Sequence, residues 1–272
     1  MKDKNPAAGG SDEERQKPKI SRGVIAGIAI LLIAAVVFAV ILLGNTGTNI
    51  SSQNCDTQTG TCALTTWTTA TPVVPVKSAR PLVELWIMSF CPYGVQMETV
   101  FRPVAELLGT STDIRVRYIA TVSGTDLSTA KSLHGNAEAI EDVRQLCIAS
   151  HAPEKYWSYI AAFDAQCYPV WTNQTLLSSC QAKVISDLGI PADSISQCIT
   201  GSEGFRLLKS ESDQASSTGT TGSPTLYING QKYTGSRNPE AIKQGICGHF
   251  DVAPASCNTN LTTQTAAASG SC

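Results

Sequence analysis

The sequence contains no Cys-x-x-Cys pair, although ten of its 272 residues are cysteines. It also lacks a His-x-x-x-His spacing, and its nearest approach to a pair of metal ligands is Cys247-Gly-His249. Zinc sites are usually built from such closely spaced cysteine and histidine pairs. The sequence therefore predicts no metal and no other cofactor, and disulfides explain its cysteines better.

An excess of basic residues is also missing. The chain has 20 lysines and arginines against 22 aspartates and glutamates, which gives a formal net charge of −2. Domains that bind nucleic acid usually carry a strongly basic surface. We therefore expect no nucleic-acid partner.

Charged and polar side chains are absent from residues 24–43, "VIAGIAILLIAAVVFAVILL". Twenty apolar residues match the hydrocarbon thickness of a bilayer when they form a helix. Basic residues in the preceding segment, with Lys17, Lys19 and Arg22 nearest the run, predict a cytoplasmic N-terminus. We therefore expect a single-pass membrane protein with a cytoplasmic tail (1–22) and an uncleaved anchor (23–44). A cleaved signal peptide is the competing interpretation.

All ten cysteines follow this apolar run, which fits an oxidising compartment outside the cytoplasm. Residues 45–81 are rich in Ser, Thr and Pro and predict a stalk. Within this stalk, Cys55 and Cys62 are expected to close a small loop. The folded domain is expected over 82–257, followed by a flexible tail over 258–272.

The domain opens with a strand–helix–strand pattern. Residues 82–90 are largely apolar, residues 95–108 carry a helical apolar stripe, and residues 113–120 alternate, with Arg115 and Arg117 expected to point outward. A strand, helix and strand in this order predict a parallel pair. Helical patterns then fill about 137–210, Asn229-Gly230 predicts a hairpin, and Asn238-Pro239 predicts the start of a last helix.

Cys91 lies where the first strand gives way to the first helix, in "SFCPYGVQ". A sulfur at a helix N-terminus meets free N–H groups and the positive end of the helix dipole, which favour thiolate over thiol. Pro92 has no N–H to lose at that position. The alternative interpretation is an ordinary buried cysteine. The cysteine at this junction, together with Ser223-Pro224 before the hairpin, resembles the thioredoxin fold, and that resemblance implies a cis Pro224 facing Cys91.

The segments "RQLCIASH", "SSCQAKV", "SISQCITGSEGFRLL", "LYINGQKY" and "GICGHFDVAPASC" resemble landmarks of the gamma-interferon-inducible lysosomal thiol reductase family and, more broadly, DsbA-like oxidoreductases. The resemblance implies an α/β thioredoxin-like fold with a helical insertion and Cys91 as the nucleophile, supported by Pro92, Tyr93, Gly94 and Pro224. Gly94 replaces the resolving cysteine of that family. Its "CQHGxxEC" signature reads "SLHGNAEA", with Ser132 and Ala139 in place of both cysteines, and we expect a local structural role for His134.

The remaining cysteines suggest a disulfide pattern. Cys180 and Cys198 flank the turn "GIP" at nearly equal distances, so an antiparallel helix pair would join them. Proximity in sequence pairs Cys247 with Cys257 and leaves Cys147 with Cys167. Cys91 and Cys272 then remain. Cys272 either reaches Cys91 as a resolving thiol or is a spare or intermolecular thiol of the tail.

These features predict a membrane-anchored, extracytoplasmic thiol-disulfide oxidoreductase of monothiol type. Its partners would be disulfide-containing proteins or small thiols, besides the membrane itself. Restoring a cysteine at position 94 is expected to speed resolution at modest structural cost. The alternative functions are a redox-inactive thioredoxin-like module that binds or chaperones extended chains around Pro224, and a glutaredoxin-like binder of glutathione or an iron–sulfur cluster.

Overall fold

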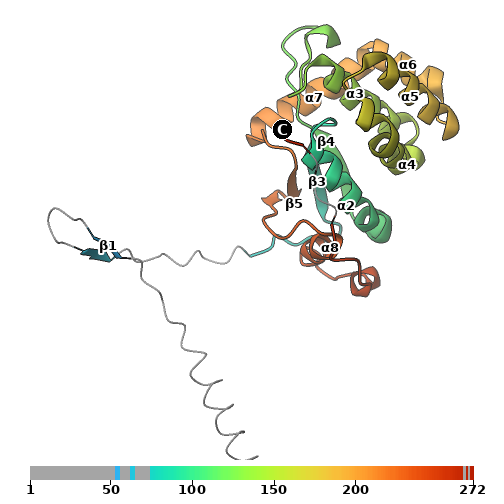
Figure 1. Ribbon diagram of the computed structural model, residues 1–272. Helices are drawn as coiled ribbons and strands as arrows, with labels where there is room; N and C mark the ends of the chain where they lie inside the picture. The colour runs from blue at the N-terminus through green and yellow to red at the C-terminus, as the bar shows by residue number, and fades with distance from the viewer. Residues whose placement is uncertain (1–52, 56–61, 65–73, 266–267, 269) are drawn as a thin grey trace, which may run out of the picture. The chain divides into compact units, whose positions relative to one another are not determined.

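The structure is a computed structural model that describes residues 53–55, 62–64, 74–265, 268 and 270–272 (Figure 1). The chain divides into two compact units, Met1–Pro72 and Val73–Cys272. In the first unit, β1 (Gln53–Cys55) and β2 (Cys62–Leu64) form an antiparallel ladder. This ladder sets Cys55 opposite Cys62. The disulfide expected between their side chains lies outside what the structure describes.

None of the helices in the described residues has the length and apolar character needed to cross a membrane. The predicted anchor, residues 24–43, lies outside those residues.

The second unit is built on a four-stranded sheet with the order β4-β3-β5-β6. Strands β3 (Leu82–Ile87) and β4 (Asp113–Tyr118) are parallel, with Leu82 opposite Asp113, so the predicted strand–helix–strand unit is confirmed. Strand β5 (Thr225–Ile228) runs antiparallel to β3, and β6 (Gln231–Lys232) pairs with β5. Asn229 and Gly230 have φ angles of 47° and 75°, as a tight hairpin turn requires.

The helices cover both faces of this sheet and form the insertion between β4 and β5 (Figure 1). Asn238 caps the last helix by accepting a hydrogen bond from the Ala241 N–H, and Pro239 is its first residue, as predicted. In chain order the α-helices are α2 (Pro92–Leu108), α3 (Asn136–His151), α4 (Tyr156–Ala162), α5 (Gln174–Asp187), α6 (Ala192–Thr200), α7 (Ser202–Thr218) and α8 (Pro239–Cys247). A π-helical turn, η4 (Phe163–Cys167), continues α4.

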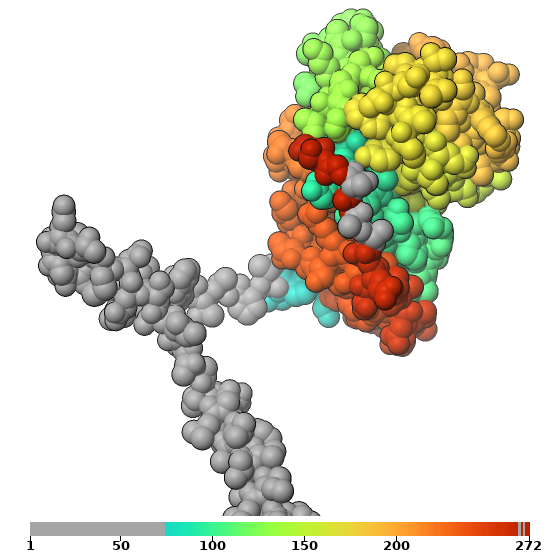
Figure 2. Space-filling view, viewed as in Figure 1, coloured from blue at the N-terminus to red at the C-terminus, as the bar shows by residue number. Residues whose placement is uncertain are grey.

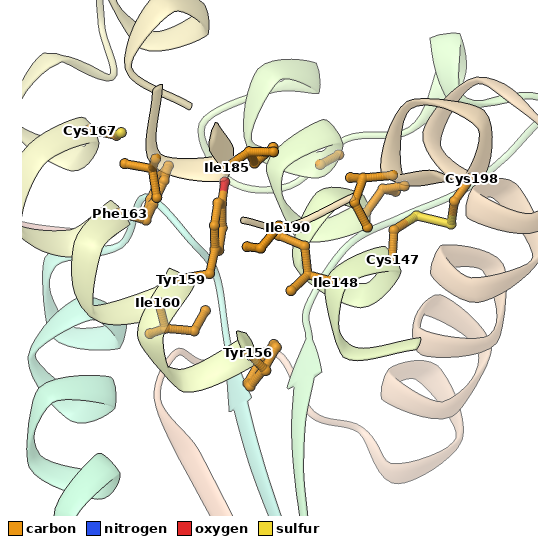
Figure 3. Close-up of a cluster of buried hydrophobic side chains, with 14 of the residues drawn as sticks. Cys147, Ile148, Tyr156, Tyr159, Ile160, Phe163, Cys167, Ile185, Ile190 and Cys198 are labelled. Atoms are coloured by element: carbon orange, nitrogen blue, oxygen red, sulfur yellow. A yellow bond between two sulfur atoms is a disulfide. The ribbon is translucent and has the colours of Figure 1, made fainter. Parts of the chain in front are cut away.

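Two hydrophobic clusters stabilise the unit. Alternate residues of β3, among them Val83 and Leu85, pack with the apolar faces of α2 and α8. The second cluster lies within the helical insertion and includes Tyr159 and Ile148 (Figure 3), as well as the Cys147–Cys198 disulfide between α3 and α6. The order of the strands, with helices α3 to α7 inserted between β4 and β5, confirms the thioredoxin-like α/β fold with a helical insertion that the sequence predicts.

Arg117 differs from the expectation that it points into solvent. Its side chain is buried on the other face of the sheet, 2.8 Å from Glu211 of α7 and 3.4 Å from Glu84 of β3. The guanidinium also lies 5.0 Å from the ring centroid of Trp86. An alternating strand pattern assumes one solvated face, and α7 covers that face here.

Candidate functional site

Cys91 is the residue before the first turn of α2, and Pro92 is the first helical residue. The backbone N–H of Val95 donates to the carbonyl oxygen of Cys91, which closes the first turn. The backbone N–H groups that precede Val95 have no acceptor within the helix. Cys91 is fully buried, whereas the neighbouring Tyr93 is 41% exposed. The helix thus begins three residues earlier than the apolar stripe indicates, and its N-terminus faces the sulfur.

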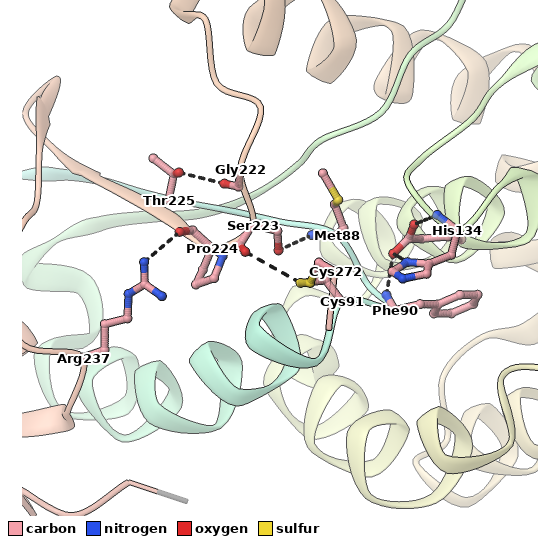
Figure 4. The surroundings of a disulfide bond; sticks show 11 residues. Met88, Phe90, Cys91, His134, Gly222, Ser223, Pro224, Thr225, Arg237 and Cys272 are labelled. Carbon is pink, nitrogen blue, oxygen red and sulfur yellow. Dashed lines mark hydrogen bonds and ion pairs between the residues drawn. A yellow bond between two sulfur atoms is a disulfide. The ribbon is translucent and has the colours of Figure 1, made fainter. Parts of the chain in front are cut away.

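Cys91 forms a disulfide with Cys272, with the two Cα atoms 5.5 Å apart (Figure 4). The C-terminal cysteine is therefore paired with the candidate nucleophile in this structure and is not a spare thiol of the tail. Gly270 passes over Pro92 at a φ of 120°, where a Cβ atom would come within 3.1 Å of the proline ring. Only glycine adopts this conformation readily.

The tail is also bound to α8 upstream of this disulfide. The buried ammonium group of Lys243 donates to the carbonyl oxygen of Thr259. The N–H of Leu261 donates to a carboxylate oxygen of Glu240 at 2.7 Å, and the Glu240 N–H donates to the Thr262 carbonyl. These contacts bind residues 259–262 of the tail to α8. Figure 2 shows the last residues in red on the surface, between the helical insertion and the residues around β5.

The cis-proline loop lies on the other side of the cysteine. The Ser223-Pro224 peptide is cis, and the sulfur of Cys91 lies 3.7 Å from the Ser223 carbonyl oxygen (Figure 4). A disulfide sulfur has no proton, so this contact becomes a hydrogen bond only when Cys91 is a thiol. The Ser223 hydroxyl oxygen accepts from the Met88 N–H at 3.0 Å.

Gly94 is required by the packing of this loop. A Cβ atom at position 94 would lie 2.8 Å from the Met88 carbonyl oxygen and 2.9 Å from the Ser223 hydroxyl oxygen. The first of these is a backbone atom that cannot rotate away. The expected modest cost of a cysteine at position 94 is therefore wrong, because the space for its Cβ is already filled.

Two carboxyl groups of α3 bind the loop that precedes Cys91. Glu138 accepts a hydrogen bond from the Phe90 N–H at 2.7 Å, and Asp142 accepts from both the N–H and the hydroxyl of Ser89. Both carboxyl side chains are fully buried. Burial raises the pKa of Asp142 well above its usual range, and the charge of Glu138 raises that pKa further. Sequence analysis missed this pair, although four-residue spacing on a predicted helix places two side chains on one face.

His134 is linked to the loop before Cys91 through Glu138 and through Trp171, which packs against Phe90. Its N–H donates to one Glu138 oxygen at 2.8 Å, and its Nδ1 lies 3.0 Å from the other. The imidazole also packs edge-on against Trp171, with ring centroids 5.1 Å apart. Both contacts fit the local structural role expected for this histidine.

The insertion is cross-linked differently from the expected pattern. Disulfides join Cys147 to Cys198 and Cys167 to Cys180, so the pairings 180–198 and 147–167 were wrong. The turn at the end of η4 brings Cys167 against α5, and this leaves Cys198 of α6 facing α3. The expected Cys247–Cys257 disulfide is present.

One group of side chains in the described residues has ligand atoms close enough to hold a metal: His151, Cys198 and Glu203, all within 4.8 Å of one another. The sulfur of Cys198 is bonded to Cys147. A metal needs the thiolate of a cysteine, so this group offers two ligands while the disulfide is intact.

A comparison with known protein families supports a thioredoxin-like fold. The family described as the vacuolar sorting receptor thioredoxin-like domain matches residues 109–247, about half of the chain. This stretch contains Pro224 and the insertion but not Cys91.

Curated relatives include vacuolar-sorting receptor 7 of Arabidopsis thaliana, 30% identical over 144 residues, which make up 47% of this chain and 23% of the receptor. Vacuolar-sorting receptor 6 is 28% identical over 128 residues, or 43% and 20% of the two chains. The chain thus spans less than a quarter of the length of these relatives.

Among solved structures, reduced DsbA of Mycobacterium tuberculosis covers 68% of this chain and 93% of its own, at 15% identity and a TM-score of 0.46. MdbA, a thiol-disulfide oxidoreductase of Actinomyces oris, covers 65% and 83%, at 12% identity and a TM-score of 0.49.

Proposed function

This chain belongs to the vacuolar sorting receptor thioredoxin-like domain family, and on that scaffold we propose that it exchanges disulfides through Cys91 with Cys272 as its internal partner. The observation that carries the proposal is the Cys91–Cys272 disulfide at the N-terminus of α2. That position stabilises the thiolate needed for exchange. The cis-proline loop on the opposite side supplies the Ser223 carbonyl as an acceptor for the proton of the Cys91 thiol, a contact that is lost when the thiolate forms.

In the reducing direction, the Cys91 thiolate attacks one sulfur of a substrate disulfide. The substrate S–S bond breaks, its second sulfur leaves as a thiolate that takes a proton, and a mixed disulfide forms at Cys91. The Cys272 thiolate then attacks the Cys91 sulfur, which releases the first substrate sulfur as a thiol and forms the 91–272 disulfide. Two electrons have passed to the substrate.

Regeneration needs two outside thiols. Cys272 is exposed whereas Cys91 is buried, so we expect the first thiol to attack the Cys272 sulfur and release Cys91 as the helix-stabilised thiolate. The second thiol then frees Cys272 and leaves with the first as a small disulfide. In the absence of Cys272, the protein would act by the monothiol route that Gly94 indicates.

A second candidate function is a redox-inactive module that binds extended chains. Its support is the family itself, because the matched relatives are named as sorting receptors and the matched stretch omits Cys91. The resemblance to lysosomal thiol reductases favours exchange. We further propose that residues 24–43 anchor the domain outside the cytoplasm.

The test compares the full-length wild type with Cys91→Ser and Cys272→Ser. Each reduced protein is mixed with a model disulfide, and acid-quenched mass spectrometry follows the adducts. The wild type should yield the 91–272 disulfide. Cys272→Ser should accumulate a mixed disulfide that decays only with added thiol. Cys91→Ser lacks the sulfur at the helix N-terminus, so no adduct should form there. Exchange at the wild-type rate in Cys91→Ser would overturn the proposal. Peptide binding without exchange in any variant would favour the second function.

A further inference from the structure

A cavity of about 260 Å³ lies between α2 and the α4–η4 segment. Its lining includes Val95, Glu98, Thr99 and Arg102 of α2, with Ala161 and Asp164 on the opposite wall. Val95 belongs to the first turn after Cys91, so this cavity opens one helical turn from the candidate nucleophile. None of the steps of disulfide exchange uses it.

Glu98 is the unusual residue of this cavity. Its side chain is 1% exposed, and neither carboxyl oxygen has a hydrogen-bond partner among the residues that the structure describes. On the opposite wall, one oxygen of Asp164 is likewise buried without a partner. Buried polar groups are almost always paired in folded proteins, because an unpaired one loses its contacts with water and gains none. We therefore expect the two Glu98 oxygens and the one Asp164 oxygen to accept hydrogen bonds from a bound ligand.

The residues that line the cavity indicate which kind of donor would fit. Three acceptors match the three N–H groups of an alkylammonium ion, and the side chains of Val95, Ile160 and Ala161 supply apolar surface for an alkyl stem. A metal fits less well, since the single three-ligand group in the described part of the chain lies elsewhere. Asp164 lies in the π-helical turn, an irregularity often found at functional sites.

We propose that this cavity binds the ammonium end of an aminoalkyl chain between Glu98 and Asp164. The ammonium could be carried by a lysine side chain of a bound polypeptide or by a free small amine. Both sources present the same chemistry.

The charges around the cavity make binding depend on pH. Burial raises the pKa of Glu98 well above its usual range, as do the nearby Asp164, Asp142 and Glu141. Burial also raises the pKa of Asp164, while Arg102 lowers it. The Arg102 guanidinium pairs with the exposed Glu106. Burial raises the pKa of Tyr118 and of Tyr156, and the charge of Glu98 raises both pKa values further. Because an ammonium ion favours ionised carboxylates, its binding should release protons and strengthen as pH rises.

Calorimetric titration of the full-length chain with n-butylammonium chloride tests the proposal. Titration in two buffers of different ionisation enthalpy reports proton release. We expect saturable binding that tetramethylammonium, which has no N–H donor, does not reproduce. Glu98→Gln and Asp164→Asn should each weaken binding at least tenfold, and Glu98→Gln should abolish proton release. Asp187→Asn, which breaks an exposed pair on α5, should leave both unchanged.

A steric variant separates binding from any loss of folding. Ala161→Leu changes no charge but fills the cavity, so it should weaken binding while its circular dichroism matches the wild type. A pair of peptides that differ only by lysine against norleucine identifies the source: tighter binding of the lysine peptide indicates a polypeptide ligand, and equal binding indicates a free amine. Absence of butylammonium binding, or unchanged binding in Glu98→Gln, would overturn the inference. The double variant Cys91→Ser/Cys272→Ser should still bind, which makes the result independent of disulfide exchange.

Discussion

The helical insertion and the C-terminal tail both hold the loop around Cys91, but by different means. The insertion binds Ser89 and Phe90 through the buried carboxyl groups of Asp142 and Glu138. The tail binds Cys91 through a single disulfide at the last residue of the sequence. A reagent must open a hydrophobic core to reach the first contact, whereas the Cys272 end of the second is exposed.

The disulfides of the two regions differ in the same way. Cys147 and Cys198 are at most 2% exposed and belong to the hydrophobic cluster of the insertion. The 91–272 disulfide instead joins a helix N-terminus to an exposed cysteine of the tail. Disulfides between packed helices constrain the fold, whereas the one at the helix N-terminus is the one that we propose takes part in exchange.

The largest effect should come from removing the disulfide between α3 and α6. The Cys147→Ala/Cys198→Ala double variant opens a loop with a sequence separation of 51, and the entropic estimate for that length is about 4 kcal/mol. Urea unfolding monitored by circular dichroism measures this loss. Cys272→Ser is the comparison. Its sequence separation of 181 gives a larger entropic estimate, about 5 kcal/mol, but we expect a smaller measured loss because the freed tail regains conformational freedom in the native state. Equal losses would erase the distinction between the two regions.

The next effect concerns Gly94 of α2, which packs against the loop before Cys91 and the cis-proline loop. Gly94→Ala should destabilise the fold by roughly 1–3 kcal/mol, as overpacking does, because its Cβ would approach the Met88 carbonyl oxygen. Gly222→Ala is the control, since nothing lies within 4 Å of a Cβ there. Chemical unfolding of both variants gives the difference. If Gly94→Ala were as stable as Gly222→Ala, the cis-proline loop would not exclude a side chain at position 94.

Stability at the cavity between α2 and the insertion should respond to alkaline pH. The folded-state pKa of Glu98 is raised above its ordinary value of 4.5, so its contribution to stability is present at acidic pH and is lost as pH rises through the folded-state pKa. Glu98→Gln cannot ionise and should gain stability relative to the wild type at alkaline pH, by about 1 kcal/mol or more. Unfolding free energies at pH 5 and pH 9, with Asp187→Asn as control, provide the check. A parallel pH dependence in both proteins would contradict it.

The tail should respond in the opposite direction, with the smallest effect. Hydrogen bonds from Lys243, Leu261 and Gln244 lower the pKa of Glu240 to about 2. Its contribution is therefore present above pH 4.5 and is lost as pH falls toward 2. Amide hydrogen exchange at Leu261, whose N–H donates to Glu240, should lose protection over that range and already be faster in Glu240→Gln at neutral pH. Protection that ignored both changes would show that other contacts hold the tail.

The sequence by itself determined the elements whose cause is local. Asn238 and Pro239 start α8, Asn229-Gly230 turns the hairpin, and the junction before Pro92 places a cysteine at a helix N-terminus; each depends on backbone preferences of adjacent residues. Tertiary structure decided the burial of Arg117, the partners of Cys147 and Cys180, and the space denied to a side chain at position 94. All three features depend on contacts between segments that are far apart in the sequence. Hydrophobic periodicity predicts that a face of a strand or helix is buried, but it does not predict which element covers that face.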